Sequence, residues 1–221
     1  MITMTSTTRE PSWLSPLLGY CHCRHYPARK DLIKPGDPAD KLLYVISGQV
    51  VVMLEDEDGR EIILAYLSKG EFIGEMGLFA PQPLRSVCIR ARSKCELAEI
   101  SYSKLKHLLE NELKDQASPL LYDLGRQLSD RLTKTSRKVS DLAFLDVTGR
   151  VASALLDLAN QPEAVTHPDG MQIRITRQEI SRIVGCSREM VGRVLKNMEE
   201  EGLITAKGKT MVIYGASRGQ D

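Results

Sequence analysis

The segment FIGEMGLF, followed closely by Arg85-Ser86, has the residue types and spacing of an anion site. Gly74 and Gly77 permit close approach of the backbone, and Arg85 supplies a forked cation that matches a phosphate. Glu75 would repel a phosphate, so we expect it to accept a hydrogen bond from a ribose hydroxyl instead. These residues predict a site for a sugar phosphate. The alternative is a glycine-rich barrel corner with a structural ion pair between Arg85 and Glu75.

A second cluster lies in the motif IVGCSREMVGRVLK, where a helix is expected to begin after Ser187. Ser187 can cap this helix, and its apolar residues fix the buried face. The outward face therefore presents Arg188, Glu189, Arg193 and Lys196. Arginine pairs with O6 and N7 of guanine, and a carboxylate accepts from N4 of cytosine, so this face can read DNA. The alternative is an ordinary solvated helix face.

The helix before this one begins with a capping box, in which Thr176 is the N-cap and Glu179 lies three residues later. Two helices joined by the short break Gly-Cys-Ser form a helix-turn-helix. A two-stranded wing follows, with Lys207 and Lys209 in its turn. These lysines and Arg177 suit phosphate contacts, which position a protein on DNA without specifying the sequence.

The first half of the chain must position the anion site, and its pattern is that of β structure. Short apolar runs separated by turn residues extend from about residue 26 to residue 100, with glycines 11 or 12 residues apart at positions 36, 48, 59 and 70. Strands at such intervals are typical of an antiparallel sandwich or barrel. Asp58-Gly59 predicts a hairpin with a tight primed turn.

Helical periodicity replaces this pattern from about residue 118 to residue 144. The apolar positions recur at steps of three and four: Leu121, Leu124, Leu128, Leu132, Thr135, Val139 and Leu142. This narrow stripe with charged flanks favours a coiled-coil-like pairing in a homodimer. The alternative is a long helix that lies on its own β domain. Thr135, beside Ser136, needs a polar partner if the stripe is buried.

Composition allows one or two globular domains, because 42% of the 221 residues are hydrophobic and 27% are charged. The net charge of +1 seems to argue against a nucleic-acid partner. However, residues 170–218 contain nine Lys and Arg against five Asp and Glu, a local excess of four positive charges. The basic residues thus gather where the helix-turn-helix is predicted.

Compartment is also indicated by the sequence. No apolar run approaches the length needed to span a bilayer, and the Thr/Ser-rich start Met1–Arg9 lacks the basic and apolar regions of a signal peptide. The five cysteines are an odd number without the density of a disulfide framework, so we interpret them as free thiols. These features predict a cytoplasmic protein without a membrane partner.

From about Leu14 to Gly215 the sequence resembles the bacterial cyclic AMP receptor proteins, or catabolite activator proteins, of the CRP/FNR superfamily. The resemblance rests on GEMGLF with RS after it, ELAEISY, TSRKVSDLAFLDVTGR, THPDGMQIRITRQEI and IVGCSREMVGRVLK. It implies an α+β fold in three parts. These are a β-barrel (jelly-roll) cyclic-nucleotide-binding domain over residues 1–117, a dimerisation helix over 118–144, and a winged helix-turn-helix over 145–221.

The resemblance also implies a cyclic AMP site, in which Arg85 and Ser86 meet the phosphate and Glu75 meets the ribose. Gly74 contributes backbone. Thr135 of the same subunit touches the base, together with Ser136 from the partner subunit. A ligand between two dimer helices would change their packing and hence the separation of the DNA-reading helices, which is an allosteric control.

A palindromic site of the TGTGA type in double-stranded DNA is implied as the target, with the paired helices one DNA turn, ~34 Å, apart. The implied DNA-binding residues are Arg177, Ser187, Arg188, Glu189, Arg193 and Lys209. The family's contact with RNA polymerase corresponds to Thr166, His167 and Gly170 in the segment THPDG. The expected function is therefore a cyclic-nucleotide-responsive, homodimeric transcription regulator.

Four alternatives differ from this expectation. Cyclic di-GMP could replace cyclic AMP as the ligand, or the protein could be a nucleotide-binding regulatory subunit that does not bind DNA. An iron–sulfur sensor is disfavoured because the motif CHCRH lacks the C-x2-C spacing of cluster ligands. An enzyme is disfavoured because neither a metal cluster nor a paired base and nucleophile is evident. We therefore expect no catalytic residue, no metal and no cofactor besides the allosteric ligand.

Overall fold

The computed structural model describes residues 10–80 and 83–217, so the Thr/Ser-rich start Met1–Arg9 lies outside the described residues. The chain forms two compact units. The first contains the described parts of residues 1–50 and 67–131, and the second contains residues 51–66 with the described part of 132–221. The predicted domain boundaries after residues 117 and 144 stay a prediction.

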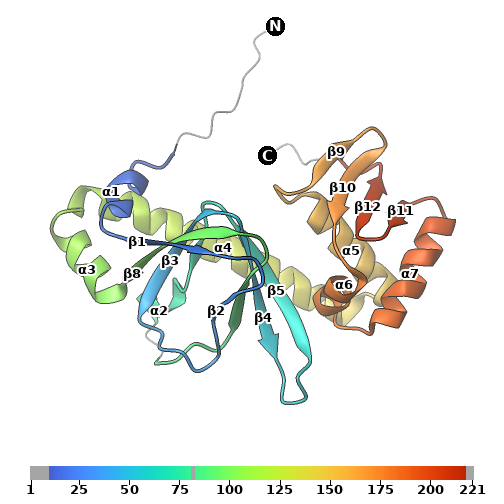
Figure 1. The fold of residues 1–221 in the computed structure, drawn as a ribbon, viewed down its shortest axis with the longest axis horizontal. Helices are drawn as coiled ribbons and strands as arrows, with labels where there is room; N and C mark the ends of the chain where they lie inside the picture. The colour runs from blue at the N-terminus through green and yellow to red at the C-terminus, as the bar shows by residue number, and fades with distance from the viewer. Residues whose placement is uncertain (1–9, 81–82, 218–221) are drawn as a thin grey trace, which may run out of the picture. The chain divides into compact units, whose positions relative to one another are not determined.

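The described residues of the β-rich half form eight strands, and Figure 1 shows how they are arranged. Their bounds are β1 His22–Tyr26, β2 Asp31–Ile33, β3 Lys41–Ser47, β4 Gln49–Glu55, β5 Glu61–Ser68, β6 Phe72–Ile73, β7 Cys88–Ala91 and β8 Cys95–Ser101. They form two four-stranded sheets, with strand orders β1-β8-β3-β6 and β2-β7-β4-β5. This jelly-roll-like arrangement confirms the predicted fold class, although the two sheets do not close into a barrel.

The turn between β4 and β5 is longer than predicted. It spans residues 56–60, and of its residues only Gly59 has a positive φ, +76°. The Asp56 carboxylate closes this loop by accepting from the backbone N–H groups of Asp58 and Arg60 at 3.0 and 2.8 Å. The prediction of a tight primed turn at Asp58-Gly59 is therefore wrong, because a side-chain cap stabilises a wider loop.

An aromatic cluster forms the centre of the first unit's core. The rings of Trp13 and Tyr44 lie 5.3 and 5.1 Å from that of Phe72, and all three residues are buried. Leu120 and Leu124 belong to the same core. Four helices contribute to it: α1 Leu14–Leu18, α2 Met76–Phe79, α3 Tyr102–Glu110 and α4 Lys114–Phe144.

Helix α4 begins four residues before its predicted start and continues through Pro119. Its early apolar residues, such as Leu124, are buried against the helix's own β unit. Farther along, Leu132 and Val139 have 69% and 61% of their surface exposed. The interpretation of a helix that lies on its own β domain therefore holds for the N-terminal part, and the pairing of the exposed residues in a homodimer stays a prediction.

The C-terminal part contains three helices and a four-stranded sheet. Their bounds are α5 Val147–Ala159, β9 Val165–His167, β10 Gly170–Arg174, α6 Arg177–Val184, α7 Arg188–Glu200, β11 Ile204–Lys207 and β12 Thr210–Tyr214. The helix-turn-helix, the capping box of Thr176 and Glu179, and the wing β11–β12 are confirmed. The sequence analysis missed the hairpin β9–β10, which extends the wing into a sheet of order β11-β12-β10-β9.

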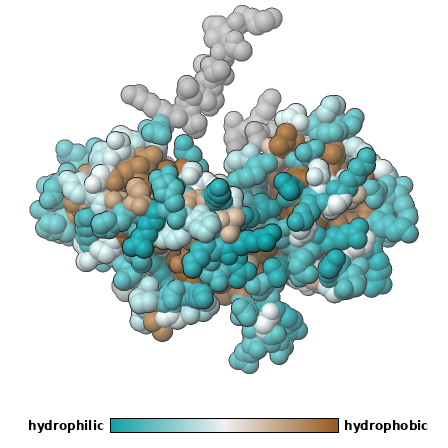
Figure 2. Space-filling view, in the orientation of Figure 1, coloured by the Kyte–Doolittle hydropathy of each residue, from teal (hydrophilic) through white to brown (hydrophobic). Residues whose placement is uncertain are grey.

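No helix in the described part of the chain combines the length and the apolar character required to cross a membrane. All five cysteines are described, and none of them forms a disulfide in the structure. On the face drawn in Figure 2, hydrophilic side chains cover most of the region of α7 and the tip of the β4–β5 hairpin.

Candidate functional site

The Arg85 guanidinium lies against the backbone of Gly74, as the anion-site prediction requires. Gly74 has φ +84°, and a Cβ there would lie 2.4 Å from Arg85 Nη1, so a larger residue would displace the guanidinium. Arg85 Nη2 donates to the carbonyl of Lys41 at 2.5 Å, and Nη1 donates to the Tyr102 hydroxyl at 3.3 Å. These bonds hold a forked cation beside a glycine backbone.

Tyr102 is part of this site, although the sequence analysis gave it no role. Its hydroxyl donates to the carbonyl of Gly74 at 2.5 Å. Burial raises the pKa of Tyr102, which keeps the hydroxyl protonated and able to donate. A Cβ on Gly77 would lie 2.6 Å from the Tyr102 oxygen, so Gly77 leaves room for this side chain as Gly74 does for Arg85. The sequence signal was Tyr102 at the end of ELAEISY, directly after a strand.

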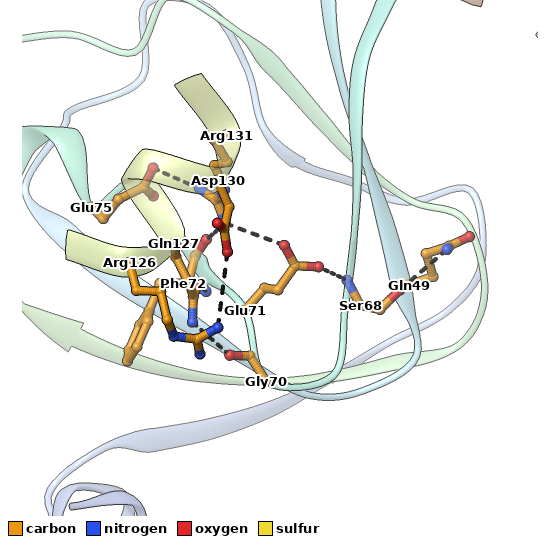
Figure 3. Close-up of polar contacts among 10 residues, drawn as sticks. All are labelled: Gln49, Ser68, Gly70, Glu71, Phe72, Glu75, Arg126, Gln127, Asp130 and Arg131. Carbon is orange, nitrogen blue, oxygen red and sulfur yellow. Dashed lines mark hydrogen bonds and ion pairs between the residues drawn. The ribbon is translucent and has the colours of Figure 1, made fainter. Parts of the chain in front are cut away.

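Glu75 is a buried carboxylate, with 4% of its surface exposed. Its Oε1 accepts from Nη1 of Arg131 at 2.6 Å, and Nη2 of Arg131 donates to the carbonyl of Phe72 (Figure 3). Glu71 lies 3.8 Å from the same guanidinium. The structure thus pairs Glu75 with Arg131 on α4, and not with Arg85 as the alternative from the sequence had it.

Arg131 is the main residue that the sequence analysis missed, because it was interpreted as one of the solvent-exposed charged residues beside the apolar stripe. The available signal was its position four residues before Thr135, which puts both on one face of a helix. The structure leaves Ser86, Thr135 and Ser136 exposed, and the last two belong to the second unit. The structure brings Gly74, Glu75 and Arg85 together, and it adds Tyr102 and Arg131 as their hydrogen-bond partners.

The predicted DNA-reading face is solvent-exposed in the second unit. Arg188, Glu189 and Arg193 are all exposed, whereas the apolar residues of α7 are buried. Ser187 accepts from the backbone N–H of Met190 at 3.2 Å, which confirms its capping role. Hydrogen bonding from the helix N-terminus, first its own backbone N–H and then Ser187, lowers the pKa of Glu189, so this carboxylate remains an ionised acceptor.

Arg177 and the wing lie next to this helix-turn-helix. Arg177 Nη1 would be 3.7 Å from a Cβ on Gly192, so its guanidinium lies close to α7. The backbone N–H of Ile175 donates to the carbonyl of Lys209 at 2.8 Å, which joins the wing turn to the start of α6. The exposed side chains of Arg177 and Lys209 are available for phosphates.

The predicted polymerase-contact residues occupy the hairpin β9–β10. Gly170 pairs with His167, and a Cβ on Gly170 would lie 2.0 Å from the carbonyl oxygen of Ile213, which explains the glycine structurally. Thr166 is exposed and His167 is half-buried. Among the described residues, no group of three or more His, Cys, Asp and Glu side chains is placed to hold a metal ion.

The chain matches two family models, the cyclic nucleotide-binding domain over residues 23–112 and the Crp-like helix-turn-helix domain over residues 149–214. These ranges contain the cradle of Gly74 and Arg85 and the reading face of α7, respectively. The class is therefore that of regulators that join a cyclic-nucleotide-binding domain to a DNA-binding domain.

Two curated proteins that align with nearly the whole chain identify the family within this class. The chain is 56% identical to the cAMP-activated global transcriptional regulator Vfr of Pseudomonas aeruginosa, covering 97% of this chain and 99% of that protein. It is 51% identical to the CRP-like protein Clp of Xanthomonas campestris pv. campestris, covering 95% and 91%. The protein belongs to the CRP-like family of cyclic-nucleotide-responsive transcription regulators.

Solved structures agree with this fold. The c-di-GMP responsive global regulator CLP of Xanthomonas campestris superposes with a TM-score of 0.86 at 52% identity, over 91% of this chain and 98% of that one. A CRP/FNR family transcriptional regulator of Thermus thermophilus, TTHA1359, superposes with a TM-score of 0.71 at 26% identity, over 87% and 93%.

The Glu75–Arg131 pair yields a stability prediction. Replacing Arg131 with alanine leaves a buried carboxylate without its cation, and the free energy of unfolding should fall by about 3 kcal/mol. As a control, Arg126→Ala removes an exposed arginine of the same helix that lies 3.7 and 3.9 Å from two aspartates. This control should cost less than about 1 kcal/mol. Urea denaturation measures both variants, and equal losses would contradict the structural role of the pair.

Proposed function

We propose that this protein is a homodimer whose binding to specific DNA is controlled by cyclic AMP. The observation that supports this most directly is the arrangement of Arg85 against Gly74, with the buried Glu75–Arg131 pair nearby in sequence and fold. A cation beside open backbone suits a phosphate, and a compensated carboxylate suits a hydroxyl donor. A cyclic nucleotide has both groups at a fixed separation.

Each group of cyclic AMP has a proposed partner. The cyclic phosphate would bind Arg85 and Ser86 together with the backbone of Gly74. Its 2′-hydroxyl is the one ribose hydroxyl outside the phosphate ring, and it would donate to Glu75. The adenine would contact Thr135 of the same subunit and Ser136 from the partner subunit.

Cyclic di-GMP is the second candidate ligand, since the CLP structure is that of a c-di-GMP responsive regulator. The charge of the site favours cyclic AMP. Cyclic di-GMP has two phosphates, whereas the proposed cradle offers one guanidinium, because that of Arg131 is engaged by Glu75 and the Phe72 carbonyl. The relative Vfr, at 56% identity, is cAMP-activated.

The proposed DNA interface consists of Arg177, Ser187, Arg188, Glu189, Arg193 and Lys209. Arg188, Glu189 and Arg193 would read bases in the major groove, and the others would contact the backbone. Two such helices in a dimer would bind a palindrome of the TGTGA type. A regulatory subunit without DNA binding is disfavoured, because the chain matches a Crp-like helix-turn-helix domain with an exposed charged face.

The exposed part of the α4 stripe supports the dimer. Leu132, Val139 and Leu142 keep 69%, 61% and 43% of their surface exposed along one helix. A monomer rarely leaves such a row of large apolar side chains in contact with water. Pairing of two α4 helices would bury them. A nucleotide bound beside Arg131 would then bias the packing of the paired helices and so the spacing of the two α7 helices.

The remaining parts of the proposal concern where and how the protein acts. Thr166 and His167, with Gly170 fixing the hairpin backbone, would contact RNA polymerase at promoters. A DNA partner and a polymerase partner imply a cytoplasmic location in a bacterium. The role is regulatory, with the nucleotide as an allosteric ligand and not as a cofactor or substrate.

The phosphate role of Arg85 predicts the effect of its removal. Arg85→Leu should weaken cyclic AMP binding at least about 100-fold, since two charge-assisted hydrogen bonds are lost. Isothermal titration calorimetry measures this affinity, and sedimentation should show an unchanged dimer. Arg60→Leu, at an exposed arginine of the β4–β5 loop, is the control and should bind normally. Normal binding by Arg85→Leu would remove this residue from the phosphate site.

The reading role of Glu189 predicts a change in base preference. Competition with base-substituted palindromes should show that one position per half-site, where the wild type discriminates about tenfold or more, loses its preference in Glu189→Ala. The control Glu200→Ala alters an exposed glutamate in the last turn of the same helix and should keep the preference. A uniform loss of affinity for all sequences would instead assign Glu189 a structural role.

A further inference from the structure

Gln127 on α4 makes two hydrogen bonds to the backbone of the turn before β6. Its Nε2 donates to the carbonyl of Gly70 at 3.0 Å, and its Oε1 accepts from the N–H of Phe72 at 3.0 Å. The carboxamide therefore binds the backbone on both sides of Glu71, as a neighbouring strand would (Figure 3). Both of its hydrogen-bonding ends are used for this contact.

The turn that Gln127 binds is itself fixed. Gly70 has φ +94°, and its N–H donates to the carbonyl of Val45 at 2.9 Å. The Glu71 carboxylate accepts from the backbone N–H of Ser68 at 2.7 Å, which closes the turn from its other side. Gln127 thus connects α4 to a rigid part of the β unit.

Arg131 follows Gln127 by one helical turn, and it bonds Phe72 and Glu75 in the same segment. Apolar packing by Leu120 and Leu124 holds α4 on the core but has no directional preference. The two Gln127 hydrogen bonds are directional and fix both the rotation and the axial position of the helix. After Arg131 the helix enters the second unit.

We propose that Gln127 is a positioning residue of the nucleotide site. By binding the backbone of Gly70 and Phe72, it sets α4 so that Arg131 holds the Glu75 carboxylate in place for the ribose 2′-hydroxyl. This inference rests on the proposed function and adds to it the residue that transmits the position of the helix to the site. Gln127 itself does not touch the nucleotide.

The test compares the affinities for cyclic AMP and 2′-deoxy cyclic AMP by calorimetry. The wild type should prefer cyclic AMP about 10- to 100-fold, because one charge-assisted hydrogen bond is at stake. In Gln127→Leu this preference should fall below about threefold, because Glu75 is no longer held for the hydroxyl. A merely structural defect would weaken both ligands equally, and an unchanged preference would overturn the proposal.

Two further variants complete the experiment. Gln116→Leu makes the same substitution at a glutamine of α4 whose Oε1 accepts from Ser12 at 3.2 Å, away from the turn, and it should keep the full preference. Gln127→Glu keeps the acceptor for Phe72 but cannot donate to Gly70. It should give an intermediate preference, and it replaces Gln127→Leu if that variant does not fold.

The proposed function can fail separately. A wild type that does not bind cyclic AMP, or does not distinguish it from the 2′-deoxy ligand, contradicts the ribose contact of Glu75. The role of Gln127 is then decided by urea unfolding of Gln127→Leu, Arg131→Ala and the double variant. The double variant should lose less stability than the sum of the two single losses, and additive losses would overturn the positioning role.

Discussion

The structure depends on one buried ion pair, between the Glu75 carboxylate in the β-rich half and the Arg131 guanidinium on α4. A carboxylate removed from water costs several kcal/mol unless a cation and further hydrogen bonds compensate it. Because the cation comes from a helix 56 residues later in the chain, the proposed nucleotide site is complete only when α4 lies on the β strands of the first unit. Formation of the site and docking of the helix are therefore the same event.

This dependence connects the parts of the proposed mechanism. Helix α4 packs on its own β unit through Leu120 and Leu124 and then continues into the second unit with exposed Leu132 and Val139. A ligand that bonds Glu75 would act on this helix through the Glu75–Arg131 ion pair. Only a ligand with unequal affinity for two arrangements of paired helices can change DNA binding, and a charged site on the proposed pairing helix would provide such a difference.

Local signals predicted much of this fold. The β strands, the long helix and the capping box of Thr176 and Glu179 were each predicted from neighbours in sequence, and each is confirmed. The Asp56 loop cap and the hairpin β9–β10 were missed. The cap depends on which backbone N–H groups one carboxylate binds, and the hairpin pairs only a few residues, so neither has a clear sequence pattern. Tyr102 and Arg131 were also missed, because their roles arise from contacts 28 to 56 residues away that no local pattern contains.

The central claim is that cyclic AMP controls specific DNA binding. Fluorescence anisotropy with a labelled TGTGA-type palindrome, titrated with protein alone, with cyclic AMP and with cyclic di-GMP, tests it most directly. We predict that cyclic AMP raises the affinity for the palindrome at least about tenfold, a coupling of about 1.4 kcal/mol, and that cyclic di-GMP does not. DNA binding that neither nucleotide changes, or that only cyclic di-GMP enhances, would contradict the account.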